Sequence, residues 1–268
     1  MWDPASYLRF TEERSRAFHD LMARVPVARP RTVVDLGCGP GHLTATLATR
    51  WPGSRIVGID NSEQMIERAR QQDVPVTFTV GDLHDWRPDP DVDVLLASAV
   101  LQWVPGHQRL LTRWARELPA GAWLAVQVPA NYDAPSHRAL WATAEHGPWR
   151  AELLPLLREA PVRDAVAYAE LLTGADCAVD AWESTYVHLL TARSGADHPV
   201  FTWLEGTALR PVRAALADTV WDRFRDTLNN RLAEAYPVRH GRVYFPFRRV
   251  FFVARTATGT AARAEENL

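Results

Sequence analysis

The segment Val33–Thr44, which reads VVDLGCGPGHLT, constrains the fold of this chain more than any other segment. An apolar run ends in an aspartate, and Gly37, Gly39 and Gly41 then alternate with other residues ahead of a helix-like stretch. Glycines at these positions let the backbone turn sharply and let a ligand lie against the main chain. The pattern therefore predicts a nucleotide-type cofactor site at a strand-to-helix turn.

The spacing of the glycines distinguishes between cofactors. A dinucleotide fingerprint reads G-x-G-x-x-G and seats a pyrophosphate at the helix amino end. This turn reads G-x-G-x-G, with Asp35 two residues before Gly37. A carboxylate there suits an ammonium-bearing ligand and would repel a pyrophosphate. All 30 basic residues are arginine, and the absence of lysine excludes a phosphate-binding P-loop and Schiff-base or pyridoxal chemistry.

Two further aspartates stand where the next predicted strands end. Residues 55–60 read as a second strand that ends in Asp60, and residues 76–83 read as a third with Asp82 near its end. The first of these acids can bind both ribose hydroxyls, and the second can bind the exocyclic amine of adenine. Asp60 could equally be a helix N-cap, and Asp82 a turn residue. Together with Asp35 and the glycine turn, they favour S-adenosylmethionine over NAD.

Residues around these acids complete the predicted cofactor site. Asn61 and Ser62 can cap the following helix. Met65 can lie on an adenine face, although a methionine there could also belong to the core. The candidate cofactor-binding residues are Tyr7, Arg14, Asp35, Gly37, Gly39, Gly41, Asp60, Asn61, Ser62, Met65, Asp82, Leu83, Ser98, Gln102 and Trp103.

Strands and helices alternate from residue 30 to residue 130, as a parallel doubly wound sheet requires. Further strands are predicted at 92–97, 123–128, 179–190 and 242–255, so we expect an α/β fold with a doubly wound, seven-stranded, mostly parallel sheet. We expect a single domain over residues 1–268. Its expected parts are an amino-terminal helical cover (1–29), a cofactor-binding core (30–131), a helical cap over the substrate pocket (132–176 and 195–240) and the last sheet strands (177–194 and 241–256).

Composition and charge limit the partners. The net charge is −2 and no basic run is present, which argues against nucleic acid as a partner. The amino terminus shows no secretion signal, and no apolar run reaches the ~18 residues of a membrane helix. We therefore expect a monomeric cytoplasmic protein that does not contact a membrane. Cys38 and Cys177 lie far apart, and we interpret Cys38 as a packing residue rather than a nucleophile. No ligand spacing for a metal is visible.

The turn from Asp35 to Gly41 and the acids after the next strands make residues 30–130 resemble class I S-adenosylmethionine-dependent methyltransferases. That resemblance implies a Rossmann-like fold, S-adenosylmethionine as the cofactor, S-adenosylhomocysteine as the product, and no metal. It does not specify the acceptor of the methyl group.

The positions of the histidines limit which chemical group can accept the methyl group. No His–Asp or His–Glu dyad stands at a spacing that predicts a general base, so we assign no catalytic residue. A carboxylate, with a reference pKa near ~4, is already ionised at pH 7 and needs no base. We therefore expect catalysis by proximity and alignment.

Segments spread over nearly the whole chain resemble the trans-aconitate 2-methyltransferase family. They are WDP at 2–4, LQWVP at 101–105, QVPAN at 127–131, TYVH at 185–188, ALRP at 208–211 and FRRVF at 247–251. The resemblance implies a bacterial cytoplasmic enzyme that uses S-adenosylmethionine to esterify one carboxylate of trans-aconitate.

An acceptor with three carboxylates needs arginine forks and hydroxyl or amide donors. Neighbouring strand residues face opposite sides, so only one of Arg248 and Arg249 can reach the site. The family's Phe-x-Arg-apolar-Phe pattern favours Arg249, although any of the arginines could instead form a surface ion pair. The candidate substrate-binding residues are Tyr7, Gln102, Trp103, Gln127, Asn131, Tyr168, Tyr186, His188, Arg210 and Arg249.

Other functions stay open at the level of sequence. The chain could methylate another small carboxylic acid or a malonyl group on an acyl carrier. More remotely, it could bind S-adenosylmethionine without catalysis, or it could be a nicotinamide enzyme.

Overall fold

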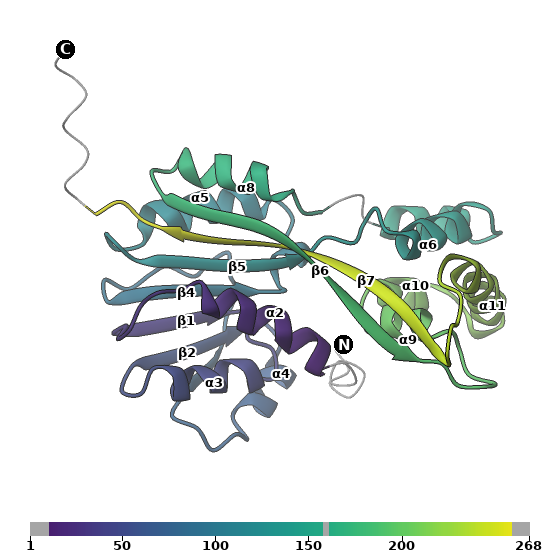
Figure 1. The fold of residues 1–268 in the computed structure, drawn as a ribbon, viewed down its shortest axis with the longest axis horizontal. Helices are drawn as coiled ribbons and strands as arrows, with labels where there is room; N and C mark the ends of the chain where they lie inside the picture. The colour runs from purple at the N-terminus through teal and green to yellow at the C-terminus, as the bar shows by residue number, and fades with distance from the viewer. Residues whose placement is uncertain (1–10, 158–160, 259–268) are drawn as a thin grey trace, which may run out of the picture.

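The computed structural model describes residues 11–157 and 161–258, with side chains from residue 15 onward. In that part of the chain seven strands form one sheet (Figure 1). The strands are β1 (Thr32–Leu36), β2 (Arg55–Asp60), β3 (Thr77–Val80), β4 (Val92–Ser98), β5 (Trp123–Pro129), β6 (Ala178–Thr191) and β7 (Arg242–Arg255).

The sheet has the strand order β3-β2-β1-β4-β5-β7-β6. The strands β1 to β5 pair in parallel, and β7 runs antiparallel between β5 and β6. The order reverses between β1 and β4, and ligands of open α/β sheets bind beyond the carboxyl ends of the strands at such a point. The predicted fold class, a doubly wound and mostly parallel sheet, is confirmed.

Helices cover both faces of the sheet and form a separate group beyond its edge. The described helices are α2 (Thr11–Ala23), α3 (His42–Arg50), α4 (Glu63–Ala69), α5 (His107–Glu117), α6 (Pro135–Glu145), α7 (Arg150–Leu153), α8 (Ala165–Thr173), α9 (Pro199–Glu205), α10 (Leu209–Ala215) and α11 (Asp218–Ala235), with short 3-10 helices η1 (Leu101–Trp103) and η2 (Leu154–Leu156). None of these described helices is long and apolar enough to cross a lipid bilayer.

Successive side chains of the central strands pack against different helix layers, because the side-chain period of a strand is two residues. In β4, Val94 and Leu96 belong to the core that includes α2 and α3. Leu95 and Ala97 belong to the core that includes α5 and α8. The near-continuous apolar runs of the central strands are therefore explained by burial on both faces.

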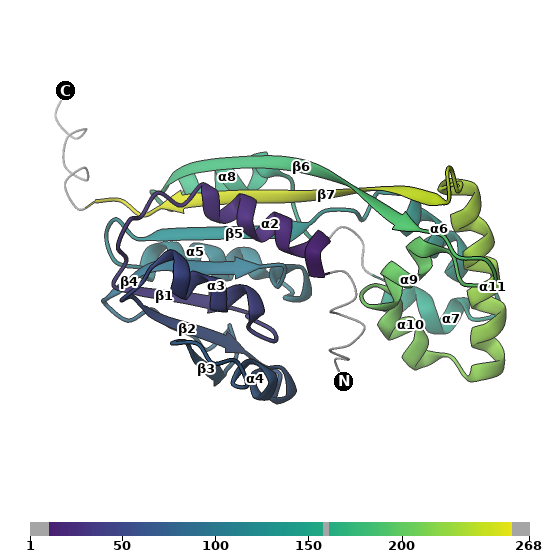
Figure 2. The same ribbon diagram turned by 60° about the horizontal axis from the view of Figure 1, so that its bottom comes forward.

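The last two strands extend past the sheet. β7 pairs with β5 only as far as Pro129↔Arg249, whereas its pairing with β6 continues to Thr191↔Arg242. The part of this two-stranded ribbon that extends beyond β5 packs on a group of helices and forms a second apolar core with them (Figures 1 and 2). We call this group of helices, α6, α7, α9, α10 and α11, the cap. The cap is thus joined to the sheet by two continuous strands.

Two helices lie elsewhere than the sequence suggests. The segment 132–176 was expected in the cap, but its last helix, α8, packs against β6 and β7 and places Tyr168 in the core of the sheet. In the expected amino-terminal cover, α2 buries Phe18 and Leu21 on the same sheet face as α3. Both helices carry an apolar stripe that the open sheet can bury. Residues 1–10 of the expected cover lie outside the described residues.

Gly41 precedes α3 with a φ of +77°, and a Cβ there would lie 2.7 Å from the Phe78 ring and 2.8 Å from the Ala69 Cβ. We predict that Gly41→Ala lowers the free energy of unfolding by about 3 kcal/mol, because a left-handed backbone costs a residue with a Cβ about 1–2 kcal/mol and overpacking adds about 1–3 kcal/mol. Urea unfolding measures the loss.

Gly195→Ala is the matched control, since Gly195 has a φ of +71° and open space where its Cβ would lie. It should lose about 1–2 kcal/mol, from the backbone alone. Equal losses in the two variants would contradict the packing argument at Gly41.

Candidate active site

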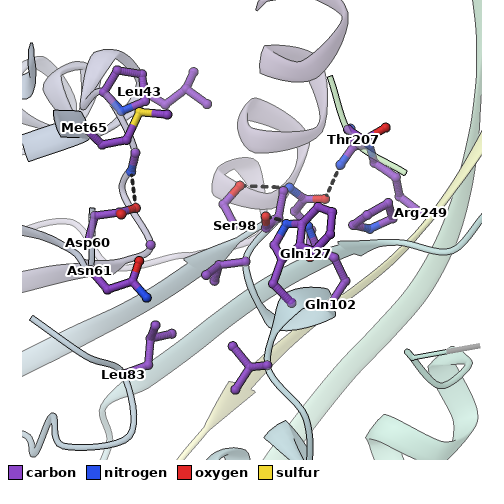
Figure 3. Close-up of a pocket in the computed structure, with 18 of the residues that line it drawn as sticks. Leu43, Asp60, Asn61, Met65, Leu83, Ser98, Gln102, Gln127, Thr207 and Arg249 are labelled. Carbon is purple, nitrogen blue, oxygen red and sulfur yellow. Dashed lines mark hydrogen bonds between the residues drawn. The ribbon is translucent and has the colours of Figure 1, made fainter. Parts of the chain in front are cut away.

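A cavity of about 300 Å³ lies at the carboxyl edge of the sheet, and we call it the crevice cavity. It extends from the glycine turn after β1 to the point where β7 leaves the sheet and α9 approaches (Figure 3). The predicted site residues that line it are Gly37, Gly39, Asp60, Asn61, Met65, Asp82, Leu83, Ser98, Gln102, Trp103, Gln127 and Arg249.

The glycine turn exposes its backbone to this cavity at one residue in particular. A Cβ on Gly39, which has a φ of +56°, would meet no atom within 4 Å. A Cβ on Gly37 would lie 2.4 Å from a methyl group of Val100, so Gly37 is needed for close packing against the loop after β4. The turn therefore presents main chain, rather than side chain, to whatever occupies the crevice cavity.

Asp60 holds the turn in place from the end of β2. Its Oδ2 accepts a hydrogen bond from the Gly39 N–H at 3.0 Å, and its Oδ1 accepts one from the Ser62 N–H at 2.9 Å. Burial raises the pKa of the Asp60 carboxyl, and these two backbone bonds counteract the increase. Ser62 caps α4 by accepting a hydrogen bond from the Met65 N–H, as an N-cap residue does.

Asp35 does not line the crevice cavity but lies buried behind the turn, with 3% of its surface exposed. The Thr44 hydroxyl donates to its Oδ2 at 2.6 Å, and its Oδ1 has no hydrogen-bond partner among the described residues. Burial raises the pKa of Asp35 to about 7, although the Thr44 bond opposes this increase. A cation in the crevice cavity would stabilise the ionised form of this carboxyl.

Asp82 lines the crevice cavity beside its neighbour His84. Asp82 Oδ1 accepts a hydrogen bond from the His84 N–H at 2.8 Å and lies 2.7 Å from His84 Nδ1. These two bonds lower the pKa of Asp82, so the group is a carboxylate at neutral pH. The three predicted acids therefore gather at one edge of the sheet, two on the cavity surface and one behind it.

The loop after β4 places the next polar side chain. Ala99 has a φ of +55°, which is rare for a residue with a Cβ, and its N–H donates to the Gln127 carbonyl at 2.9 Å. Its carbonyl accepts a hydrogen bond from Gln102 Nε2 at 2.7 Å. These bonds fix η1, so that Gln102 and Trp103 border the crevice cavity.

Three polar side chains from three neighbouring strands form a hydrogen-bonded chain along the crevice cavity (Figure 3). Gln127 Nε2 donates to Ser98 Oγ at 2.9 Å, and Arg249 Nη1 donates to Gln127 Oε1 at 2.8 Å. Arg249 is 3% exposed, and its guanidinium lies 5.0 Å from the Phe247 ring centroid. A buried cation is thus held at the cap end of the cavity.

Arg248 faces the other way, as the alternation of strand residues requires. Its guanidinium forms ion pairs with Asp133 at 3.2 Å and Glu183 at 3.1 Å. Its backbone N–H donates to Asn131 Oδ1, which fixes the loop after β5. Of the two adjacent arginines, Arg249 is the one that lines the crevice cavity.

A second cavity of about 110 Å³, which we call the cap cavity, lies between η1, α6, η2 and the α9–α10 region. It shares Gln102, Trp103, Trp203, Thr207 and Phe247, together with Pro129, with the crevice cavity. The predicted residue Asn131 lines the cap cavity rather than the crevice cavity.

Several predicted substrate ligands do not line either cavity in the described part of the chain. The Tyr168 hydroxyl lies 2.7 Å from His107 Nε2 within the sheet core, where burial raises the pKa of Tyr168 to about 12. The Tyr186 hydroxyl donates to Asp20 on α2. His188 stacks on Trp203, with ring centroids 4.7 Å apart, and so lies behind it.

The remaining predicted residues do not line either cavity, or they lie outside the described residues. Arg210 lies on α10 and does not line the crevice or cap cavity, and neither does Gly41. Tyr7 falls outside the described residues, and Arg14 lies in α2 with its side chain outside them.

Some lining residues are not among the candidates from the sequence. Examples are Leu43, His84, Val100, Thr207 and Phe247. Phe247 could have been found, because it stands two residues before Arg249 and therefore shares a strand face with it. No sequence pattern indicates Thr207 as a site residue, because it follows α9 in the cap, far along the chain from the glycine turn.

The comparisons with known proteins agree with one another. Residues 33–121 match a family described as a methyltransferase domain. A protein named trans-aconitate 2-methyltransferase from Mycobacterium sp. (strain KMS) is 54% identical over 263 residues, which cover 96% of this chain and 100% of that protein. A protein of the same name from Mycolicibacterium gilvum (strain PYR-GCK) is 52% identical over 259 residues, covering 95% and 99% of the two chains.

Solved structures with lower identity share the fold. A putative methyltransferase from Bacillus halodurans superposes with a TM-score of 0.57 at 15% identity, covering 91% of this chain and 100% of that one. Such a likeness supports the architecture of the sheet and its helices and nothing finer.

The raised pKa of Asp35 predicts how stability depends on pH. Folded Asp35 keeps its proton up to about pH 7, whereas the unfolded group loses it near its ordinary pKa of 3.8. The folded state thus binds more protons between these values, so the contribution of Asp35 to the free energy of unfolding should fall as the pH rises from about 4 to 7 and then level off.

Urea unfolding of the wild type and of Asp35→Asn over this pH range measures the effect. The wild type should lose stability relative to the variant as the pH rises. Asp73→Asn, at an exposed position, is the control and should show no such trend. A difference between wild type and Asp35→Asn that is constant with pH would contradict the assignment.

Proposed function

The chain belongs to the trans-aconitate 2-methyltransferase family, and on that premise we propose that it transfers a methyl group from S-adenosylmethionine to a carboxylate of trans-aconitate. The observation that carries the proposal is the position of Arg249. Its buried guanidinium stands at one end of a cavity whose other end is the glycine turn. An arginine fork beside a cofactor crevice suits a carboxylate acceptor.

The glycine-turn end of the crevice cavity fits an adenosyl sulfonium cofactor. The open space at Gly39 lets a ligand approach the backbone. Asp60 faces the cavity from the end of β2, as a partner of ribose hydroxyls should, and Met65 and Leu83 offer apolar surface for adenine. The Oδ1 of Asp35, which has no hydrogen-bond partner among the described residues, lies behind the turn, where an ammonium group would stabilise the ionised carboxyl.

The cap end of the same cavity fits the acceptor. When bound, S-adenosylmethionine supplies a methyl group on a positively charged sulfur. A carboxylate acceptor, with an ordinary pKa near ~4, is ionised at pH 7 and needs no general base. Arg249, oriented by Gln127, holds such a carboxylate, and Gln127 is in turn held by Ser98.

Positioning therefore accounts for catalysis in this proposal. Trp203 and Phe247 border the acceptor end and help to exclude water. Alignment of two reactants can supply about 7–11 kcal/mol of the barrier. We extend the proposal to a monomeric enzyme of the cytoplasm, where the free thiols of Cys38 and Cys177 would stay reduced.

The proposal is tested by incubating the protein with S-adenosylmethionine that carries an isotope-labelled methyl group, with and without trans-aconitate. We expect label in a product that base hydrolyses, as a methyl ester does. Label transfer to no small polycarboxylate, under conditions where the protein binds S-adenosylhomocysteine, would refute the proposed activity while leaving the cofactor assignment intact.

We predict that Asp60→Asn weakens the binding of S-adenosylhomocysteine by at least about tenfold, because a hydrogen bond to a charged group contributes about 1.5–3 kcal/mol. Isothermal titration calorimetry measures the dissociation constant. Asp73→Asn, the same substitution on the surface, should leave the constant unchanged. If Asp60→Asn binds as tightly as the wild type, Asp60 serves only as a support of the turn.

We predict that Arg249→Lys lowers kcat/KM for trans-aconitate by about 10–100-fold, because lysine keeps the charge but loses the bidentate fork. Arg248→Lys is the neighbouring control on the outer face of β7 and should change kcat/KM less than about threefold. Binding of S-adenosylhomocysteine should be equal in both variants. Equal losses of kcat/KM in the two variants would contradict the role of Arg249.

A further inference from the structure

The cap cavity adjoins the acceptor end of the crevice cavity. Arg249 and Phe247 are two residues apart in β7, so they share a strand face, and both line the crevice cavity. Phe247 also lines the cap cavity, and Arg249 does not. A molecule held at Arg249 thus has the aromatic surface of Phe247 between its bound end and the cap cavity.

The cap cavity has walls of a different chemical kind. Its described lining contains no aspartate, glutamate or arginine. Leu140, Trp141, Leu204, Ala208 and Pro211 make up much of its surface, from helices of the cap. The cap cavity therefore disfavours a charged carboxylate and favours an apolar alkyl or aryl group.

The polar groups in the cap cavity do not change this conclusion. Burial lowers the pKa of His137 to about 4, so its ring is neutral at pH 7. The Asn131 oxygen accepts the Arg248 N–H, so among the described residues only the neutral Nδ2 amide of Asn131 remains available to a ligand. A second or third carboxylate of an acceptor would find no cation here among the described residues.

The size of the cap cavity is sufficient for a small substituent. The cap cavity has a volume of about 110 Å³, several times the ~10–15 Å³ that one water needs. A short alkyl chain or a phenyl ring therefore fits. Such a group, attached near the carboxylate that Arg249 binds, would leave water and contact the apolar side chains of the cap cavity.

We infer that the acceptor site extends past Phe247 into the cap cavity, and that the protein binds dicarboxylates with an alkyl or aryl substituent in addition to trans-aconitate. This inference rests on the proposed function, because it assumes that Arg249 binds an acceptor carboxylate. The subsite would determine specificity, and the residues that the cap contributes to it, among them Leu140, Trp141 and Leu204, do not line the crevice cavity.

The test measures binding, so that it does not depend on turnover. Succinate, 2-propylsuccinate and 2-benzylsuccinate are titrated by calorimetry into the protein saturated with S-adenosylhomocysteine. Each buried methylene should tighten binding by about fourfold at most, so three carbons allow up to about 60-fold. We expect 2-propylsuccinate to bind at least about tenfold more tightly than succinate. Equal dissociation constants for the three compounds would overturn the inference.

A matched pair of variants locates the effect. Ala208→Phe, at the start of α10, adds a ring to the cap cavity, and Ala215→Phe adds the same ring at an exposed position at the end of that helix. The ratio of the succinate to the 2-propylsuccinate dissociation constant should fall to near one in Ala208→Phe and stay at the wild-type value in Ala215→Phe. A ratio that is unchanged in Ala208→Phe would show that the propyl group does not enter the cap cavity and would overturn the inference.

Circular dichroism and S-adenosylhomocysteine binding confirm that each variant is folded. One further measurement separates this inference from the proposed function. Label transfer to trans-aconitate by the wild type tests the proposed function alone. Transfer to trans-aconitate without any preference for the substituted succinates would refute the subsite and leave the proposed function standing.

Discussion

The position at which β5 ends determines the rest of the site. Beyond Pro129↔Arg249, β7 continues with β6 alone, so Arg249 stands where the sheet gives way to the cap. A buried guanidinium is costly unless its donors are bonded. Gln127, from β5 itself, accepts one of those bonds and is tied to Ser98 on β4. This buried charge is therefore held by strands of the same sheet whose β1 carries the glycine turn.

The parts of the structure that depend on local sequence could be predicted. Gly37 and Gly41 have φ values of +75° and +77°, and the turn between strand and helix requires such residues. The two-residue period of β7 separates Arg248 from Arg249 without further information. The apolar runs of the central strands follow from burial on both faces. The alternation of strands and helices, the glycine turn and the choice of Arg249 over Arg248 follow from short-range patterns, with the family resemblance supporting the last.

The residues that could not be placed are those whose partners lie far along the chain. Tyr168 and His107 are 61 residues apart, and Tyr186 and Asp20 are 166 apart. A tyrosine hydroxyl indicates a hydrogen bond but not its direction, and in both cases packing of a helix on the sheet decides it. Asp35 stands at the expected place in the turn, yet its side chain points to Thr44 on α3 rather than into the crevice cavity. The spacing of a motif predicts where a residue lies in a strand or turn. The packing of the whole chain determines which groups its side chain contacts.

The helices α9 to α11 are an insertion between two antiparallel strands that pair with each other. The register of β6 on β7 does not depend on what joins their ends, so this insertion can change in length or sequence while the sheet stays as it is. In the proposed function, the methyl donor lies at the glycine turn, and much of the surface that contacts the acceptor comes from the cap. The acceptor of the methyl group can therefore change during evolution while the part of the chain that would bind the methyl donor stays the same.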